Sequence, residues 1–192
     1  MPLEKPRRAL FDRPPSSADA ATAAAHATAL TQRVGVAALN IRRFRTGDAH
    51  ALFEIFHSAV HLVACADYTP EQIDAWAPST LDQCLWAQRL PALSPFVAEL
   101  NGRPVGYADL QLSGYIDHFF VSGHHARTGI GTRLMAALHV EAKRLQLDQL
   151  TSDVSLTAEL FFAQAGFTLV ARREVVLRGV PILNARMRKA LH

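Results

Sequence analysis

The chain has 192 residues, of which 49% are hydrophobic, and its formal net charge at neutral pH is +3. A hydrophobic share of this size supports a sizeable core and excludes a chain that is disordered throughout. The charge is too small to indicate a nucleic-acid partner, and no apolar run approaches the ~18 residues of a membrane span, so we expect neither nucleic acid nor membrane among the partners.

The N-terminal part of the chain differs from the rest. Prolines recur before residue 16, alanines dominate residues 18–30, and large apolar side chains are few. This composition predicts a flexible N-terminal extension over residues 1–36 and one domain over residues 37–192. An organelle transit peptide and a start codon placed too early are alternatives. The two cysteines, Cys65 and Cys84, carry no nucleophile motif, so we expect a reduced, cytoplasmic protein.

The domain begins with a predicted strand over residues 37–43 and a helix from Asp48 to about Cys65. One face of this helix is apolar, and the other includes His57 and His61, one turn apart. Two histidines at this spacing could ligate a metal, but no third ligand motif accompanies them, so we expect a solvated stripe and no metal. His61, near the helix end, is a candidate substrate residue.

Two further helices are expected before the next strand. Thr69 and Gln72 form a predicted capping box, which begins a helix that carries Trp76. The next helix is expected to begin at Ser79 or Thr80.

A hairpin and a glycine-containing loop come next. Asn101-Gly102 is a strong two-residue turn signal between strands predicted within residues 95–112. The aromatic and β-branched run 115–121 predicts another strand, and helical periodicity follows the glycines. Glycines at a helix start, together with its unpaired N–H groups, indicate a site for a pyrophosphate-sized anion at residues 126–132.

The loop carries a motif with a known counterpart. Val121 followed by the run Arg127-Thr128-Gly129-Ile130-Gly131-Thr132 resembles motif A of the GNAT superfamily of acyl-CoA-dependent N-acyltransferases. Ala126 occupies the slot where the family places Gln or Arg.

The remaining elements resemble the family in order. A predicted strand over 149–154 and a helix that ends at Gly166-Phe167 resemble motif B, and two closing strands are predicted over 167–178 and 182–188. Their alternating arginines are expected to form a solvated face, with a role near the cofactor's adenosine phosphate as the alternative. The resemblance covers about residues 38–190.

The resemblance implies an α/β (α+β) fold with a mixed, mostly antiparallel central sheet of about seven strands, flanked by helices and splayed at the glycine-loop strand. It also implies acetyl-CoA as co-substrate, held by backbone N–H groups of the splayed strand and of the loop. The residues assigned to acetyl-CoA are Phe119, Phe120, Val121, Ala126, Arg127, Thr128, Gly129, Ile130, Gly131 and Thr132.

Proton transfer requires side chains. Asp117 and His118 are adjacent polar residues in an otherwise apolar strand. Consecutive strand residues face opposite sides, so both can serve one reacting atom only where a bulge turns them. They fit either a general base or a hydrogen-bonded structural pair. Many family members place a tyrosine four residues before the motif B glycine as the acid toward the thiolate. This chain has Phe162 there, so either solvent or another group supplies the proton, or the chemistry is weak. Ser155 and Thr157 are candidates for such a group, and helix capping is their alternative role.

In the family the helices between the first two strands shape the acceptor pocket. The substrate candidates are therefore His61, Tyr68 and Trp76, with Trp86 beside them. Aromatic residues at this spacing are also typical of a core.

The leading hypothesis is an N-acetyltransferase that acts on a primary amine of a small or amino-acid-like acceptor. The departures at Ala126 and Phe162 motivate an alternative, a non-catalytic acyl-CoA-binding or regulatory module, and a protein acetyltransferase is a third reading. We expect acetyl-CoA and a small amine as partners, and a homodimer.

Overall fold

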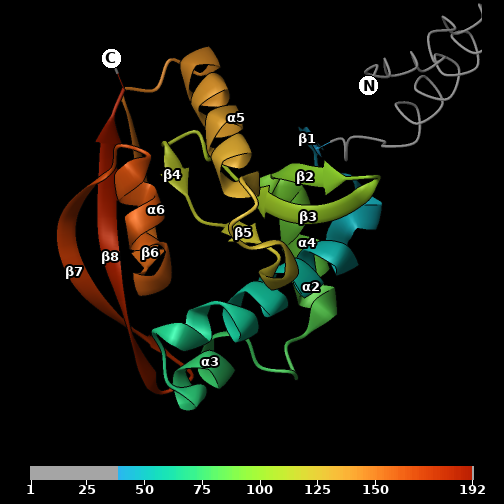
Figure 1. Ribbon diagram of the computed structural model, residues 1–192, viewed down its shortest axis with the longest axis vertical. Coiled ribbons are helices and arrows are strands. Elements are labelled where there is room, and N and C mark those ends of the chain that lie inside the picture. Colours follow the sequence, from blue (N-terminus) through green and yellow to red (C-terminus); the bar gives the residue numbers. More distant parts are fainter. Residues whose placement is uncertain (1–38, 192) are drawn as a thin grey trace, which may run out of the picture. The chain divides into compact units, whose positions relative to one another are not determined.

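The computed structural model describes Leu39–Leu191 (Figure 1). The extension predicted over residues 1–36 lies outside the described residues, so the division of the chain at residue 37 stays a prediction. The helices are α2 (Ala49–Leu62), α3 (Pro70–Trp76), α4 (Gln83–Leu93), α5 (Ile130–Arg144) and α6 (Glu159–Gln164). The strands are β1 (Leu39–Arg43), β2 (Phe96–Leu100), β3 (Arg103–Ala108), β4 (Tyr115–Ile116), β5 (Phe119–Val121), β6 (Gln149–Ser155), β7 (Thr168–Leu177) and β8 (Val180–Ala190).

The strands form two four-stranded sheets. The first has the order β1-β2-β3-β5 and is antiparallel. The second has the order β4-β6-β8-β7, in which only β4 and β6 are parallel. The predicted α+β fold with a mostly antiparallel sheet is confirmed. The described residues contain eight strands instead of about seven, because the strand predicted over residues 115–121 is divided into β4 and β5.

This division produces the predicted splay. β4 pairs with β6, with Ile116 opposite Ser152, whereas β5 pairs with β3, with Phe119 opposite Ala108. Beyond Ile116 the chain therefore leaves β6 and joins the other sheet. We call the separation of β5 from β6 the splay.

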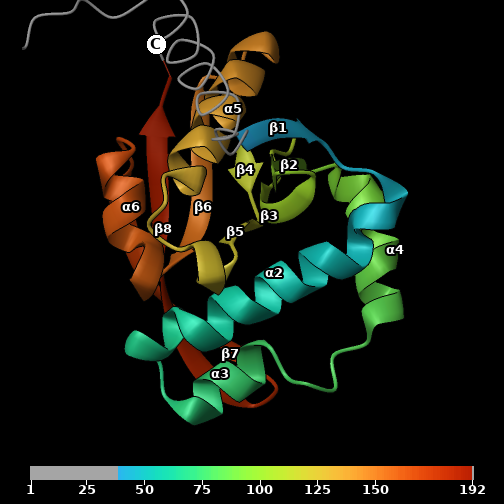
Figure 2. The same ribbon diagram turned by 45° about the vertical axis from the view of Figure 1, so that its right-hand side comes forward.

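Helices cover both faces of the sheets (Figures 1 and 2). α5 packs on one face of the first sheet, and α2 and α4 pack on the other. α5 and α6 pack on one face of the second sheet, and α3 packs beside β8 on its opposite face. The core accordingly has two parts, one around Leu134 and Leu150 and one around Leu52, Phe56 and Tyr107.

Several local signals are confirmed in the backbone. Asn101 and Gly102 have φ values of 51° and 79°, as a tight hairpin turn requires. Gly166 has φ 89° and ends α6 as a left-handed cap. Thr69 begins α3 with the predicted capping box.

The start of α4 differs from the prediction. The helix begins at Gln83 and not after Ser79 or Thr80. Asp82 is the cap, because its Oδ1 accepts the N–H groups of Cys84 at 2.8 Å and Leu85 at 3.1 Å. A carboxylate at a helix start also interacts favourably with the helix dipole.

The segment Thr46–Ala66, which contains α2, is long and apolar enough by composition to cross a membrane. Leu52, Phe56 and Val60 on α2 are nevertheless at most 6% exposed and belong to the core. Packing against the first sheet accounts for the apolar side chains of this helix.

Candidate active site

A buried carboxyl group divides the strand. Asp109, just after β3, is 0% exposed. Its Oδ1 accepts hydrogen bonds from the N–H of Asp117 at 3.0 Å and of His118 at 2.6 Å, and its own N–H donates to the carbonyl of His118 at 3.0 Å. Two consecutive N–H groups that share one side-chain oxygen cannot continue a regular ladder, so the chain bulges. β3 therefore ends at Ala108 and not at the predicted Leu112.

The bulge brings the two predicted catalytic side chains together. His118 Nε2 lies 3.7 Å from Asp117 Oδ2, and His118 Nδ1 lies 3.4 Å from the hydroxyl oxygen of Tyr107. Tyr107 is fully buried, and burial raises the pKa of its phenol well above the ordinary value, so the hydroxyl stays protonated. The Asp117 side chain is 47% exposed and the His118 side chain 21%. Asp117 is thus the solvent-facing member of the pair.

The electrostatics of the site favour a neutral imidazole. Burial lowers the pKa of His118 below its usual 6.5, although the charge of Asp117 opposes this shift. The ring is therefore uncharged at neutral pH and can accept a proton. Burial also raises the pKa of Asp109 to about 6, although the hydrogen bond from the N–H of His118 opposes this rise. Asp109 Oδ2 has no hydrogen-bond partner among the described residues.

β5 directs alternate N–H groups toward the splay. The N–H of Ser122 donates to the carbonyl of Val105 next to it on β3. Alternation directs the N–H of Phe120 to β3 as well, and the N–H groups of Phe119 and Val121 away from it. These two groups have no hydrogen-bond partner among the described residues.

The loop before α5 is exposed and passes through two left-handed residues. Arg127 has φ 60° and Gly129 has φ 85°. Open space surrounds the position of a Cβ at Gly129, so its backbone conformation is what favours glycine. A Cβ at Gly131 would lie 3.3 Å from the Phe161 ring, so there close packing is the reason. Among the described residues none of the N–H groups over 126–132 donates a hydrogen bond, which suits them to hold phosphate oxygens.

The phenylalanine at the usual tyrosine position is part of the core. Phe162 is 2% exposed. Its ring centroid lies 5.0 Å from that of Phe167, 5.4 Å from that of Phe119 and 5.8 Å from that of Phe161. It supplies packing and no proton.

The two hydroxyl candidates have different environments. Thr157 Oγ1 donates to Asp67 Oδ2 at 2.7 Å, so this hydroxyl has a structural partner. Ser155 ends β6 opposite Asn184, and its hydroxyl caps no helix. Ser155 is therefore the freer of the two to act as an acid.

Of the predicted substrate residues, Trp76 lies near the splayed strand and Tyr68 packs against Trp76. Tyr68 is 6% exposed, donates its hydroxyl to the Leu183 carbonyl at 2.7 Å and accepts the N–H of Leu156 at 2.9 Å. Trp76 packs edge-on against Tyr68 and lies 6.5 Å from Phe120 between ring centroids. Tyr68 thus ties the α2–α3 connection to the second sheet, and Trp76 is the member closer to β5.

His61 lies near Tyr68, but no contact joins it to the splayed strand. Its ring stacks on His57 at 4.1 Å and its Nε2 lies 2.8 Å from the Ala77 carbonyl oxygen. With Tyr68 it lines a cavity of about 250 Å³ whose walls include no residue of β4 or β5. Among the residues of Leu39–Leu191, no group of three or more His, Cys, Asp or Glu side chains could hold a metal ion.

Sequence reasoning missed Asp109 and placed too little weight on Trp86. Asp109 is a lone carboxylate in the apolar stretch predicted as the return strand, which is a signal for a buried structural role. The Trp86 ring stacks on His118 at 5.4 Å and on Phe56 at 5.1 Å. It forms the wall behind the candidate base.

Comparison with known proteins agrees with this geometry. The family model for an acetyltransferase (GNAT) domain matches residues 64–191. The chain is 35% identical over 150 residues to an uncharacterized N-acetyltransferase of Escherichia coli, YafP, covering 78% of this chain and 95% of that protein.

Solved structures share the architecture. A crystal structure described as a GCN5-related N-acetyltransferase (aminotransferase, class-II) from Rhodopseudomonas palustris has a TM-score of 0.76 and 32% identity, covering 81% of this chain and 98% of that chain. The PaiA N-acetyltransferase of Thermoplasma acidophilum, in complex with coenzyme A, shares the fold with a TM-score of 0.63 and 14% identity, covering 80% and 99%.

The splayed sheet and the glycine loop at the start of α5 define an acyltransferase that uses an acyl-CoA. The chain belongs to the GNAT family of acetyltransferases, and its co-substrate is acetyl-CoA. The identification made from motifs A and B is confirmed.

Proposed function

We propose that the protein transfers the acetyl group of acetyl-CoA to a primary amine of a small acceptor, with the Asp117–His118 pair as general base. The observation that supports this proposal is the bulge of Asp117 and His118 around Asp109, because the pair precedes the N–H groups of β5 that have no partner among the described residues. Proton acceptor and carbonyl-binding donors then converge at one end of the splay.

Each group has a defined task in this mechanism. Bound acetyl-CoA supplies the thioester. The N–H groups of Phe119 and Val121 bond the thioester carbonyl and a pantetheine carbonyl, and the one at the thioester stabilises the negative charge that develops on its oxygen. As the amine nitrogen bonds to the carbonyl carbon and the carbon–sulfur bond breaks, the Asp117–His118 pair takes the proton of the amine. The hydroxyl of Ser155 gives a proton to the leaving thiolate and regains one from water.

A pH profile tests the base. Because the pKa of His118 is lowered below 6.5, the proton-accepting form is present above that depressed pKa and is lost as the pH falls through it. We expect kcat/KM, measured as CoA thiol release with an acceptor panel, to rise to a plateau with a midpoint below pH 6.5. His118→Gln should remove this limb and lower kcat by about 10²–10⁴-fold.

The control is His50→Gln, which changes an exposed histidine in the first turn of α2. Its kcat and pH profile should match those of the parent. Parent rates in both His118→Gln and Asp117→Asn would overturn the assignment of the base. Tight acetyl-CoA binding without release of CoA by any amine would favour the non-catalytic binding module.

Two further expectations belong to the proposal. Cys65 and Cys84 are free and exposed, which supports a reducing, cytoplasmic location. β7 is an edge strand with exposed Leu169, Val170 and Val176, which supports a homodimer.

A further inference from the structure

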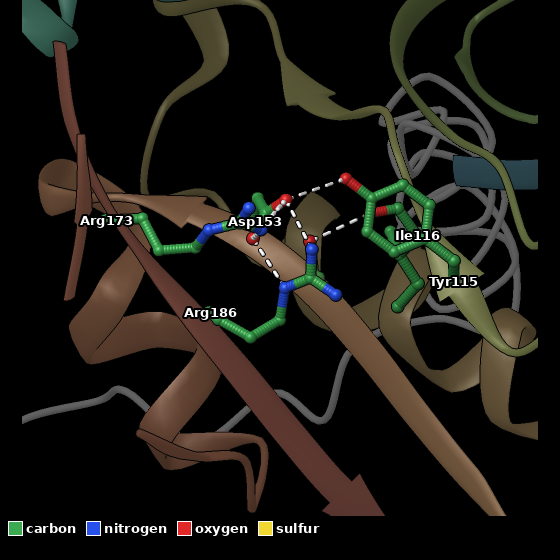
Figure 3. Close-up of polar contacts among 6 residues, drawn as sticks. Tyr115, Ile116, Asp153, Arg173 and Arg186 are labelled. Carbon is green, nitrogen blue, oxygen red and sulfur yellow. Dashed lines mark hydrogen bonds and ion pairs between the residues drawn. The ribbon is translucent and has the colours of Figure 1, made fainter. Parts of the chain in front are cut away.

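One face of the second sheet carries polar side chains from all four strands (Figure 3). Tyr115 comes from β4, Asp153 from β6, Arg186 from β8 and Arg173 from β7. Their neighbours in sequence, such as Ile116 and Met187, are buried under α5 and α6, so this polar set lies on the opposite face. We call these four residues the arginine face.

The arginine face is organised around one carboxylate. Asp153 accepts Nε and Nη2 of Arg186 at 2.6 and 2.8 Å, Nη1 of Arg173 at 3.2 Å and the hydroxyl of Tyr115 at 3.3 Å. Burial alone would raise the pKa of Asp153, but the bonds and charges of the two arginines outweigh burial and lower it. Asp153 therefore stays ionised, and its oxygens are already occupied.

Positive charge is in excess on this face. Two guanidinium groups pair with one carboxylate, which leaves one positive charge in excess. Arg188 lies two residues after Arg186 on the same side of β8 and makes no ion pair among the described residues. The side chains of Arg173 and Arg186 are 44% and 33% exposed. Several of their N–H donors have no protein acceptor within Leu39–Leu191, so they remain available to a ligand. Arg173, Arg186 and Arg188 thus form a charged surface with Asp153 as its counter-ion, and not only a solvated face.

The arginine face lies beside the candidate base. Ile116 pairs with Ser152, so Asp117 is level with Asp153 one strand away, where the two strands begin to separate. Neighbouring strands are about 5 Å apart. A molecule whose nitrogen is near Asp117 therefore reaches the guanidinium groups with an arm of roughly 5–10 Å, one to two strand spacings. α5 and the glycine loop are on the other side of the sheet, so this is the side left to the acceptor.

We propose that the arginine face binds an anionic group of the acceptor, and that the acceptor is a small amine that also carries a carboxylate or a phosphate. This inference rests on the proposed acetyltransferase function and on Asp117 as part of the base. Guanidinium groups bind both anions with paired N–H donors. They add no affinity for an amine that lacks an anionic group.

Matched acceptors test the proposal. L-amino acids are compared with their carboxamides, and O-phosphoethanolamine with ethanolamine, by CoA thiol release. We expect at least tenfold higher kcat/KM for the anionic member of one series, and the two series separate carboxylate from phosphate. Arg173→Gln should raise KM for the anionic member at least fivefold and leave its uncharged partner unchanged. Arg103→Gln, an exposed arginine at the start of β3, is the control and should match the parent for both.

Equal kcat/KM within every pair, or an equal effect of Arg173→Gln on both members, overturns the inference and leaves the acetyltransferase function in place. A binding arm separates the two failures. Calorimetry of N-acetylglycine against N-methylacetamide, in the presence of CoA, should show binding of the carboxylate alone and its loss in Arg173→Gln. Absence of CoA release by any amine rejects the proposed function. Absence of binding by both N-acetylglycine and its phosphate counterpart, N-acetyl-O-phosphoethanolamine, rejects the arginine face independently.

Discussion

At the scale of single residues, Asp109 holds the backbone at the candidate base. One of its oxygens holds the backbone of both Asp117 and His118, and the other has no partner among the described residues. A buried carboxylate in this state destabilises the fold when ionised. The bulge that brings Asp117 and His118 together is therefore maintained at the expense of stability.

Asp109→Asn tests whether the ionised Asp109 carboxylate lowers the stability of the fold. The folded-state pKa of about 6 lies above the usual 3.8, so the stability contributed by the protonated group is complete below 3.8 and is lost as the pH rises through about 6. A rise of the Asp109 pKa from 3.8 to about 6 corresponds to at most about 3 kcal/mol. Asparagine keeps the accepting oxygen and removes the charge, so its stability relative to the parent should increase between pH 4 and pH 7.5.

Urea unfolding of both proteins at the two pH values measures this difference. A stability difference that does not change with pH would contradict it. Asp109→Ala is the companion variant, because it also removes the acceptor of two N–H groups. It should lower both stability and kcat, since an unsatisfied buried donor costs about 1–3 kcal/mol.

At the scale of elements, the start of α5 is the clearest functional unit. Its N–H groups are free, Gly129 is left-handed, and Gly131 packs against α6. The left-handed Gly129 and the packing of Gly131 against Phe161 thus define the loop conformation. Such preorganisation reduces the entropy lost on binding.

Gly129→Glu should lower acetyl-CoA affinity at least tenfold, which is about 1.4 kcal/mol, because a carboxylate would project next to the pyrophosphate and the residue would leave its favoured conformation. Gly47→Glu adds the same charge at another glycine with open space and should bind normally. Calorimetry on folded proteins decides, and equal affinities for the two variants would remove the phosphate site from this loop.

The sequence alone predicts correctly the elements that local signals define. Asn101-Gly102, the Thr69 capping box and Gly166 each determine their own backbone geometry. The division of the strand over residues 115–121 could not be predicted, because its cause is a side chain on another strand. The same limit explains why Asp117 and His118 were left as either a base or a structural pair. Which of these roles they have depends on a bulge of non-local origin.

At the scale of the whole molecule, residues 1–36 are predicted to be dispensable, because they offer little large apolar surface to bury. A chain that starts at Ala37 should melt within a few degrees of the full-length protein. A chain that starts at Phe44 is the matched control. It lacks β1 and Arg42, whose guanidinium pairs with Asp48 and Glu99 at 2.7 Å each, and should lose many degrees. Similar losses in both truncations would mean that the extension supports the fold.

The splay also has a consequence for amide hydrogen exchange. Along β5, the amide protons of Phe120 and Ser122 face β3 and should be protected from deuterium in the unliganded protein, whereas those of Phe119 and Val121 face the splay and should exchange early. Addition of acetyl-CoA should slow the second pair and leave the first unchanged. Slower exchange at alternate residues of β5 would identify the N–H groups that bond the thioester and the pantetheine arm. These bonds would replace those of the missing neighbour strand.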